Sequence, residues 1–232
     1  MKIKAILDFL FPQFCINCEK QGCYLCPGCF NNLIILSQQS CPNCRKPNDF
    51  GKFCGVRCSE NFYFDQLIVC STYEKAGLLK KLLVLLKYKF VEEVAHILGK
   101  LLRYQFAYFS HNFNRKEIVI VPVPLHKKRL KYRSFNQAWL LAQSLAVDFN
   151  FVNLCDCLIR RKFEKSQVLA DREHRILNLK DSFMVEEEFV DFMRGKTVLL
   201  IDDVATTCST LNECSKALKA SGVKYICGLV LG

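Results

Sequence analysis

The sequence predicts an α/β protein in which helices flank a mostly parallel β-sheet, with a small zinc-ribbon-like module at the N-terminus. Short apolar runs alternate with longer amphipathic stretches over the last two-thirds of the chain, as in parallel sheets. Nine of the 15 cysteines lie within residues 15–58. We therefore expect a cysteine-rich zinc-binding module over residues 1–64 and an α/β domain over residues 65–232.

Composition and charge restrict the function. The 232 residues are 51% hydrophobic, which is enough for one medium domain with a small module and argues against disorder. The net charge of +11 favours an anionic partner such as a phosphorylated ligand, a nucleic acid or an anionic membrane. No apolar run is long enough to span a bilayer, and the N-terminus lacks the features of a secretory signal. We therefore expect a cytoplasmic protein.

The cysteines of the N-terminal module come in closely spaced pairs. Two thiolates two residues apart in a tight turn can point at one tetrahedral metal ion, and two such pairs complete a four-cysteine site. The spacing therefore predicts up to two structural Zn²⁺ ions, and it leaves open whether the pairs combine sequentially or interleave. The predicted ligands are Cys15, Cys18, Cys26, Cys29, Cys41, Cys44, Cys54 and Cys58.

The α/β domain begins with a strand and two helices. LIVCSTY (67–73) is rich in apolar, β-branched and aromatic residues, as strands are. Residues 74–89 place leucines at helical spacing with lysines on the other face, and residues 91–109 repeat this amphipathic pattern. IVIVPVP (118–124) is a continuous apolar run that two prolines stop, which is typical of a buried parallel strand.

The second half of the domain continues the alternation. Residues 135–148 have helical spacing, and a short strand pair is expected around 152–160. KTVLLID (196–202) predicts a buried strand, and residues 210–222 predict a helix that ends at a glycine. A last strand is expected at 225–231. Strands that alternate with helices in this way favour a mostly parallel sheet covered on both faces.

The stretch VLLIDDVATTCSTL (198–211) carries the strongest chemical signal. Asp202 and Asp203 follow a buried strand, and ligands of open α/β sheets bind at this carboxyl end. The next turn offers backbone N–H groups at a helix N-terminus, where phosphate binds well, and its hydroxyls add donors. The two carboxylates suit a ribose diol or a Mg²⁺ ion. The predicted phosphate loop consists of Ala205, Thr206, Thr207, Cys208, Ser209 and Thr210.

This stretch resembles the ribose-phosphate signature of type I phosphoribosyltransferases. The resemblance implies that Asp202 and Asp203 hold the ribose hydroxyls of phosphoribosyl pyrophosphate (PRPP), with Mg²⁺, and that the loop holds its 5′-phosphate. The family usually has glycine where this chain has Cys208, which predicts strain if the backbone there needs a positive φ. The purine-salvage branch has aspartate where this chain has Thr206, so that branch is disfavoured.

The whole order of motifs is similar to the ComF (ComFC) competence-protein family. The resemblance implies a role in natural transformation, in which the protein handles incoming single-stranded DNA in the cytoplasm. It also implies partners such as a DNA-uptake helicase or a membrane channel component at the inner face of the membrane. Ser134 is a departure, since glycine is usual there. The resemblance rests on the cysteine pairs and on LDFLFPQFCINC (7–18), VPVPLHKKRLKYRSFNQAWLLAQSLA (121–146) and RRKFEKSQVLADREHRILNLKDSF (160–183).

The segment HKKRLKYR (126–133) is predicted to be a basic loop after the strand at 118–124. It has five Lys or Arg residues and no acidic one. Three interpretations remain open: contact with the pyrophosphate of PRPP, contact with DNA phosphates, or a solvated positive surface. The candidate phosphate contacts are Lys127, Lys128, Arg129, Arg133 and Arg161.

Three functions are compatible with these motifs. The first is a DNA-handling protein whose phosphoribosyltransferase-like domain binds PRPP or a related phosphosugar. The second is an active phosphoribosyltransferase that transfers ribose 5-phosphate from PRPP to an unknown acceptor. The third is a sensor that binds PRPP without turnover. The sequence assigns no catalytic residue, and fold by itself does not decide between them.

Overall fold

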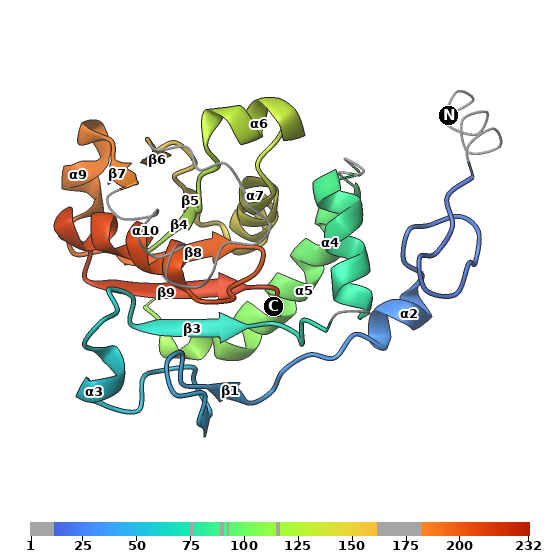
Figure 1. Cartoon of the computed structure of the whole chain (residues 1–232), viewed down its shortest axis with the longest axis horizontal. Helices are drawn as coiled ribbons and strands as arrows, with labels where there is room; N and C mark the ends of the chain where they lie inside the picture. The colour runs from blue at the N-terminus through green and yellow to red at the C-terminus, as the bar shows by residue number, and fades with distance from the viewer. Residues whose placement is uncertain (1–11, 75–76, 89–90, 92, 115–116, 162–181) are drawn as a thin grey trace.

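The computed structural model describes residues 12–74, 77–88, 91, 93–114, 117–161 and 182–232 (Figure 1). Its centre is a five-stranded parallel sheet, which confirms the predicted α/β fold. From one edge to the other, the strands are β3 (Gln66–Val69), β9 (Tyr225–Val230), β8 (Thr197–Asp202), β4 (Ile118–Pro122) and β5 (Val152–Asn153).

The sheet is buried on both faces because the middle residues of its central strands are apolar and pack against a layer on either side. In β4, Ile118 and Ile120 join one core cluster, whereas Val119 and Val121 join the other. Residues of β8 and β9 alternate in the same way. This period of two explains why these segments are continuous apolar runs in the sequence.

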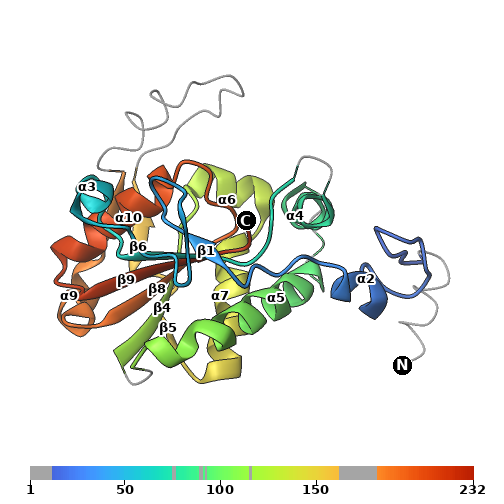
Figure 2. The same ribbon diagram turned by 90° about the horizontal axis from the view of Figure 1, so that it is seen from below.

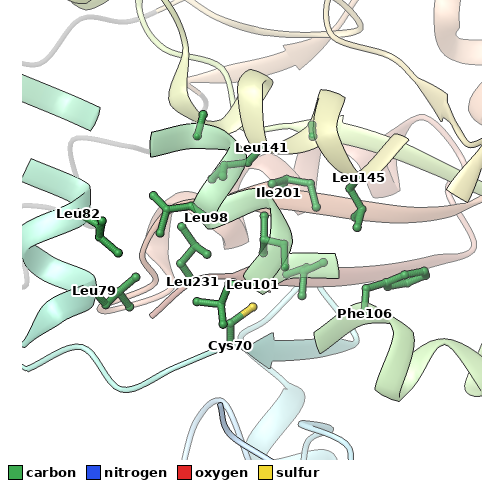
Figure 3. Packing of buried hydrophobic residues seen from close by; sticks show 14 of the residues in the cluster. Cys70, Leu79, Leu82, Leu98, Leu101, Phe106, Leu141, Leu145, Ile201 and Leu231 are labelled. Carbon is green, nitrogen blue, oxygen red and sulfur yellow. The ribbon is translucent and has the colours of Figure 1, made fainter. Parts of the chain in front are cut away.

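One face of the sheet is covered by α4 (Leu78–Tyr88), α5 (Glu93–Phe109) and α7 (Gln137–Phe149), and α5 continues into a short 3₁₀ turn at Ser110–Asn112. Figure 3 shows leucines of these three helices against Ile201 and Leu231. The other face is covered by α10 (Ser209–Ala220), α9 (Glu187–Met193) and the antiparallel pair β6 (Leu158–Arg160) and β7 (Phe183–Val185).

Two local predictions were wrong. The basic segment 126–133 is a helix, α6 (Lys127–Arg133), because lysine, arginine and leucine favour helix and His126 caps its first turn by accepting a bond from the Lys128 N–H. The expected strand pair around 152–160 separates into β5, which extends the main sheet, and β6, which pairs with β7. Residues 162–181, including most of the basic stretch after Arg161, lie outside the described residues.

The N-terminal part contains α2 (Pro27–Asn31), a hairpin of β1 (Gln39–Ser40) with β2 (Pro47–Asn48), and α3 (Val56–Ser59). Figures 1 and 2 both place α2 at the end of the molecule beyond α4 and α5. β1 and α3 instead lie along the body near β3. Within the described residues, no helix is both long and apolar enough to cross a membrane.

The connections define where a ligand can bind. From β4 the chain passes through α6 and α7 to β5, whereas from β8 it passes through α10 to β9, on the opposite side. α7 and α10 contribute to different core clusters and so cover opposite faces. The neighbours β4 and β8 therefore form the switch point of the sheet, and a crevice at their carboxyl ends is the usual ligand site of such folds.

Candidate functional site

The cysteine pairs combine sequentially in two units. In the first, which we define as residues 12–33, the Sγ atoms of four cysteines lie within 4.8 Å of one another. In the second, residues 39–60, three Sγ atoms meet the same limit, and the Cys54 Sγ lies 3.7 Å from the Cys44 Sγ. Each cluster could hold a metal ion, and the interleaved alternative is excluded. The first unit contains Cys15, Cys18, Cys26 and Cys29; the second contains Cys41, Cys44, Cys54 and Cys58.

The two units share one backbone design. In each unit the first two cysteines form a tight turn, which we call the knuckle. The residue after the second cysteine of this turn is Glu19 in the first unit and Arg45 in the second. It has a left-handed backbone, with φ of 61° at Glu19 and 63° at Arg45. Its N–H donates to the carbonyl of the first cysteine, at 2.8 Å from Glu19 to Cys15 and at 3.0 Å from Arg45 to Cys41. The knuckles therefore have the same shape, and they present residues 19 and 45 in equivalent positions.

The knuckle backbone favours the thiolate at the first cysteine of each unit. Burial opposes the ionisation of Cys15, but backbone N–H groups of its own unit outweigh burial and lower the pKa of this thiol to about 6. Cys41 has the same balance of causes and also a pKa of about 6. Since thiolates are the form that binds zinc, the donor set and its surroundings fit a tetrahedral Zn²⁺ ion in each unit.

The acidic pair lies at the carboxyl end of β8, as expected. The backbone N–H of Asp203 donates to Asp202 Oδ1 at 2.8 Å, which turns the Asp202 carboxyl toward the start of the loop. Asp202 as a whole residue is half-buried, but its carboxyl group is buried. Desolvation of this carboxyl group is the main cause that raises its pKa to about 7. The neighbouring Asp203 charge adds to this rise, and Lys87 and Arg160 oppose it.

Asp203 has a partner that the sequence does not reveal. The Nζ of Lys87, near the end of α4, lies 2.6 Å from Asp203 Oδ2, and both side chains are largely buried. Lys87 therefore faces the candidate site, whereas its basic sequence context suggests an outward surface. The ion pair neutralises one of two adjacent negative charges, which allows the pair to persist at a strand end.

The loop after β8 has the form expected of a phosphate site. Cys208 caps the start of α10 with φ of 59°, so it adopts the left-handed backbone that glycine favours and carries the predicted strain. The hydroxyls of Thr207 and Ser209 lie 2.7 Å apart. In the described part of the chain, the backbone N–H groups of Thr206, Thr207 and Thr210 donate to no protein acceptor. These donors at a helix N-terminus are suited to an anion.

The predicted basic residues have different surroundings. Lys127 and Lys128 are exposed on α6, and Arg129 is half-buried there. Arg133 is engaged within the protein, since its Nη1 donates to Gln137 Oε1 at 3.0 Å and its guanidinium lies 5.5 Å from the centre of the Tyr88 ring. Arg161 is exposed beside the β6–β7 pair. α6 follows β4 and the phosphate loop follows β8, so both begin beyond the carboxyl ends of neighbouring parallel strands.

Ser134, the other position where the resembled family usually has glycine, has the same left-handed backbone as Cys208. Ser134 ends α6 with φ of 63°, and its N–H donates to the Leu130 carbonyl at 2.8 Å. Both positions where the resembled family usually has glycine, Ser134 and Cys208, therefore require a left-handed backbone. The chain keeps the turns and accepts strain on the order of 1 kcal/mol at each.

A cavity of about 590 Å³ opens beside α6, on the β5 side of the sheet. Its walls include the rings of Phe135 and Trp139, and its polar groups include Asp156 and Arg160. Arg160 links this cavity to the acidic pair, because its charge reaches the Asp202 carboxyl and lowers that group's pKa. Trp139 is 38% exposed at this wall.

Sequence comparisons identify relatives along most of the chain. No protein-family model matches it. The chain is 31% identical to Competence protein F of Haemophilus influenzae over 222 residues, which cover 88% of this chain and 94% of that protein. It is 28% identical to Competence protein ComFC of Streptococcus pneumoniae over 206 residues, with 87% and 84% covered. It is also 28% identical to DNA utilization protein YhgH of Escherichia coli K12 over 188 residues, which are 80% of each chain. With this similarity and the predicted α/β architecture, the chain belongs to the ComF/ComFC family.

Proposed function

We propose that this protein takes part in DNA uptake and that it binds PRPP or a related phosphosugar at the switch point between β4 and β8. The first half of the proposal is supported by relatives named competence proteins and DNA utilization proteins. The second half is supported by one observation above all. Paired carboxylates, loop N–H groups that have no acceptor within the described chain, and a cationic helix all follow the carboxyl ends of the neighbouring strands β4 and β8.

Each of these groups has a role in this proposal. Asp202 and Asp203 accept the ribose hydroxyls or hold a Mg²⁺ ion, and the loop 205–210 binds the 5′-phosphate through its N–H groups and hydroxyls. Lys127, Lys128 and Arg129 bind the pyrophosphate. Lys87 holds the Asp203 carboxylate in place while no ligand is bound. Zn²⁺ in the two cysteine units stabilises the N-terminal part.

Calorimetry with PRPP and Mg²⁺ tests the sugar-phosphate site. The double variant D202N/D203N should lose measurable binding, because it removes both carboxylate acceptors and leaves the shape of the site. D191N is the control, since Asp191 is exposed on α9 and pairs only with Arg194, just after the helix, among the described residues. PRPP binding that survives in the double variant would refute the assignment of the acidic pair.

For single-stranded DNA, we propose that exposed cations of α6 contact the phosphates. Binding should weaken steeply with salt, and K127A/K128A should reduce the log–log slope by about 1.4, because each phosphate contact accounts for roughly 0.7 of that slope. The control K196A/K224A removes two positive charges at the amino ends of β8 and β9, the opposite edge of the sheet. Equal slopes in the two double variants would contradict a DNA contact at α6.

The cavity beside α6 favours a second candidate, an active phosphoribosyltransferase. Its aromatic wall and its Asp156 and Arg160 side chains could bind a planar polar acceptor next to the proposed PRPP site. Release of pyrophosphate from PRPP in the presence of an acceptor would support this candidate. PRPP that is bound but not consumed with any of a panel of nucleobases, nucleosides and single-stranded oligonucleotides would favour the sensor.

A further inference from the structure

The two cysteine units differ in what they touch, although their knuckles are equivalent. In the second unit, Arg45 Nη2 donates to the carbonyl of Thr206 at 3.2 Å. Thr206 belongs to the proposed phosphate loop, 161 residues further along the chain. In the first unit, the equivalent residue is Glu19, and among the described residues no hydrogen bond or ion pair joins residues 12–33 to residues 202–212.

The far end of the second unit makes another contact with the same region. Shortly after Cys58, the N–H of Tyr63 donates to Asn212 Oδ1 at 2.7 Å, and Asn212 Nδ2 donates to the Asn61 carbonyl at 3.0 Å. Asn212 lies in the first turn of α10, directly after the phosphate loop. The second unit and its C-terminal extension therefore bond both to the loop and to the first turn of α10.

The knuckle fixes the position of Arg45. Its left-handed backbone, its bond to the Cys41 carbonyl and the bond from the Cys41 N–H to the Lys46 carbonyl all belong to the turn that surrounds the thiols. Bound metal would tie the two ends of this turn together. The Arg45 side chain therefore extends to the loop from a base that the metal site makes rigid.

From these contacts we infer that Arg45 is a positioning residue for the phosphate loop and that the second cysteine unit, but not the first, is part of the phosphate site. The guanidinium holds the Thr206 carbonyl outward, so that the neighbouring N–H groups remain directed at the anion. Its positive charge also adds to the positive end of α10. This inference rests on the proposed phosphate-binding role of residues 205–210.

The test compares R45A with E19A in the full-length, metal-loaded protein. The two changes are matched, because both remove a charged side chain from a left-handed residue after a knuckle. Hydrogen exchange of the amides of residues 203–211, measured without ligand, should be faster in R45A and unchanged in E19A. PRPP affinity should fall about tenfold in R45A, as expected for the loss of one charge-assisted hydrogen bond, and should stay within twofold in E19A.

Two further variants distinguish the loss of the hydrogen bond from the loss of side-chain volume. R45K keeps a donor that can reach a carbonyl and should restore much of the exchange protection, whereas R45M keeps the length without a donor and should behave as R45A does. The metal content of each variant is measured. If R45A has lost metal, R45K and R45M are compared with each other instead. Protection in R45M equal to that of the unmodified protein would overturn the role of the hydrogen bond.

The outcomes distinguish this inference from the proposed function. If the unmodified protein binds no PRPP but the exchange contrast between R45A and E19A appears, the sugar-phosphate proposal fails and the positioning role stands. If loop exchange is the same in R45A and the unmodified protein, or rises equally in E19A, the positioning role is refuted whatever PRPP does.

Discussion

The two cysteine units use the same knuckle for different purposes. The first unit packs on α5, where the ring centres of Phe30 and Tyr104 lie 6.2 Å apart, and it stands at the end of the molecule (Figure 1). The second unit lies along the body and reaches the loop after β8 through Arg45. A repeated local motif can therefore be structural in one copy and part of a ligand site in the other, because the neighbours decide its role.

The largest expected effect comes from removal of the thiols of each knuckle. C41S/C44S should release one metal ion, lower the melting temperature and abolish PRPP binding, because this change removes the anchor of the phosphate loop. C15S/C18S should also release one metal ion, but its PRPP affinity should stay within a few-fold of the original. Metal analysis, thermal unfolding and calorimetry check these results.

Equal loss of PRPP binding in the two cysteine variants would remove the functional distinction between the units. The predicted division of the chain at residue 64 also remains a proposal. Limited proteolysis would test it: a cut between the first unit and the hairpin, rather than near residue 64, would show that the second unit belongs to the body.

A smaller effect concerns pH and the carboxyl pair, which lies before the loop that only the second unit contacts among the described residues. The pKa of Asp202 is raised to about 7 from an ordinary value of 3.8, so the folded protein favours the protonated form. The resulting cost to stability is absent below pH 3.8, grows as the pH rises and is complete above pH 7. D202N should therefore be more stable than the unmodified protein at pH 8, on the order of 2 kcal/mol, and equally stable near pH 4.

Denaturant unfolding at pH 4, 6 and 8 measures this difference. C15S/C18S should leave the pH dependence in place, since the first unit is remote from Asp202 in the described structure. A D202N variant whose stability differs from that of the original by the same amount at all three pH values would show that Asp202 titrates normally. Mg²⁺–PRPP binding by the unmodified protein should strengthen as the pH rises through 7, because the ionised carboxylate is the better acceptor.

The smallest effect concerns a left-handed residue outside both units. Ser134 is exposed and has φ of 63°, so S134G should relieve backbone strain. The greater freedom of glycine in the unfolded chain offsets part of this gain, which leaves about 0.5 kcal/mol of added stability. Thermal unfolding should show a small rise in melting temperature with metal content unchanged. A fall in melting temperature would mean that the serine side chain stabilises the protein by more than its left-handed backbone destabilises it.

Much of the architecture could be predicted from sequence because its signals are local. The strands at 118–124 and 196–202 are apolar at successive positions, since a parallel sheet covered on both faces buries every residue. Segment 126–133 was wrongly predicted to be a loop because its high charge is typical of loops. Its residues favour helix once His126 caps the first turn.

The sequence by itself determined the chemistry that short spacings impose: cysteine pairs that can form metal knuckles, and two carboxylates followed by a hydroxyl loop at the end of a buried strand. Tertiary structure decided which pairs share a site, that Lys87 neutralises Asp203, and that Arg45 rather than Glu19 meets the phosphate loop. The physical reason is the range of the interactions. A turn of a few residues fixes its own geometry, but a bond between Arg45 and Thr206 forms only when packing brings residues 161 positions apart into contact.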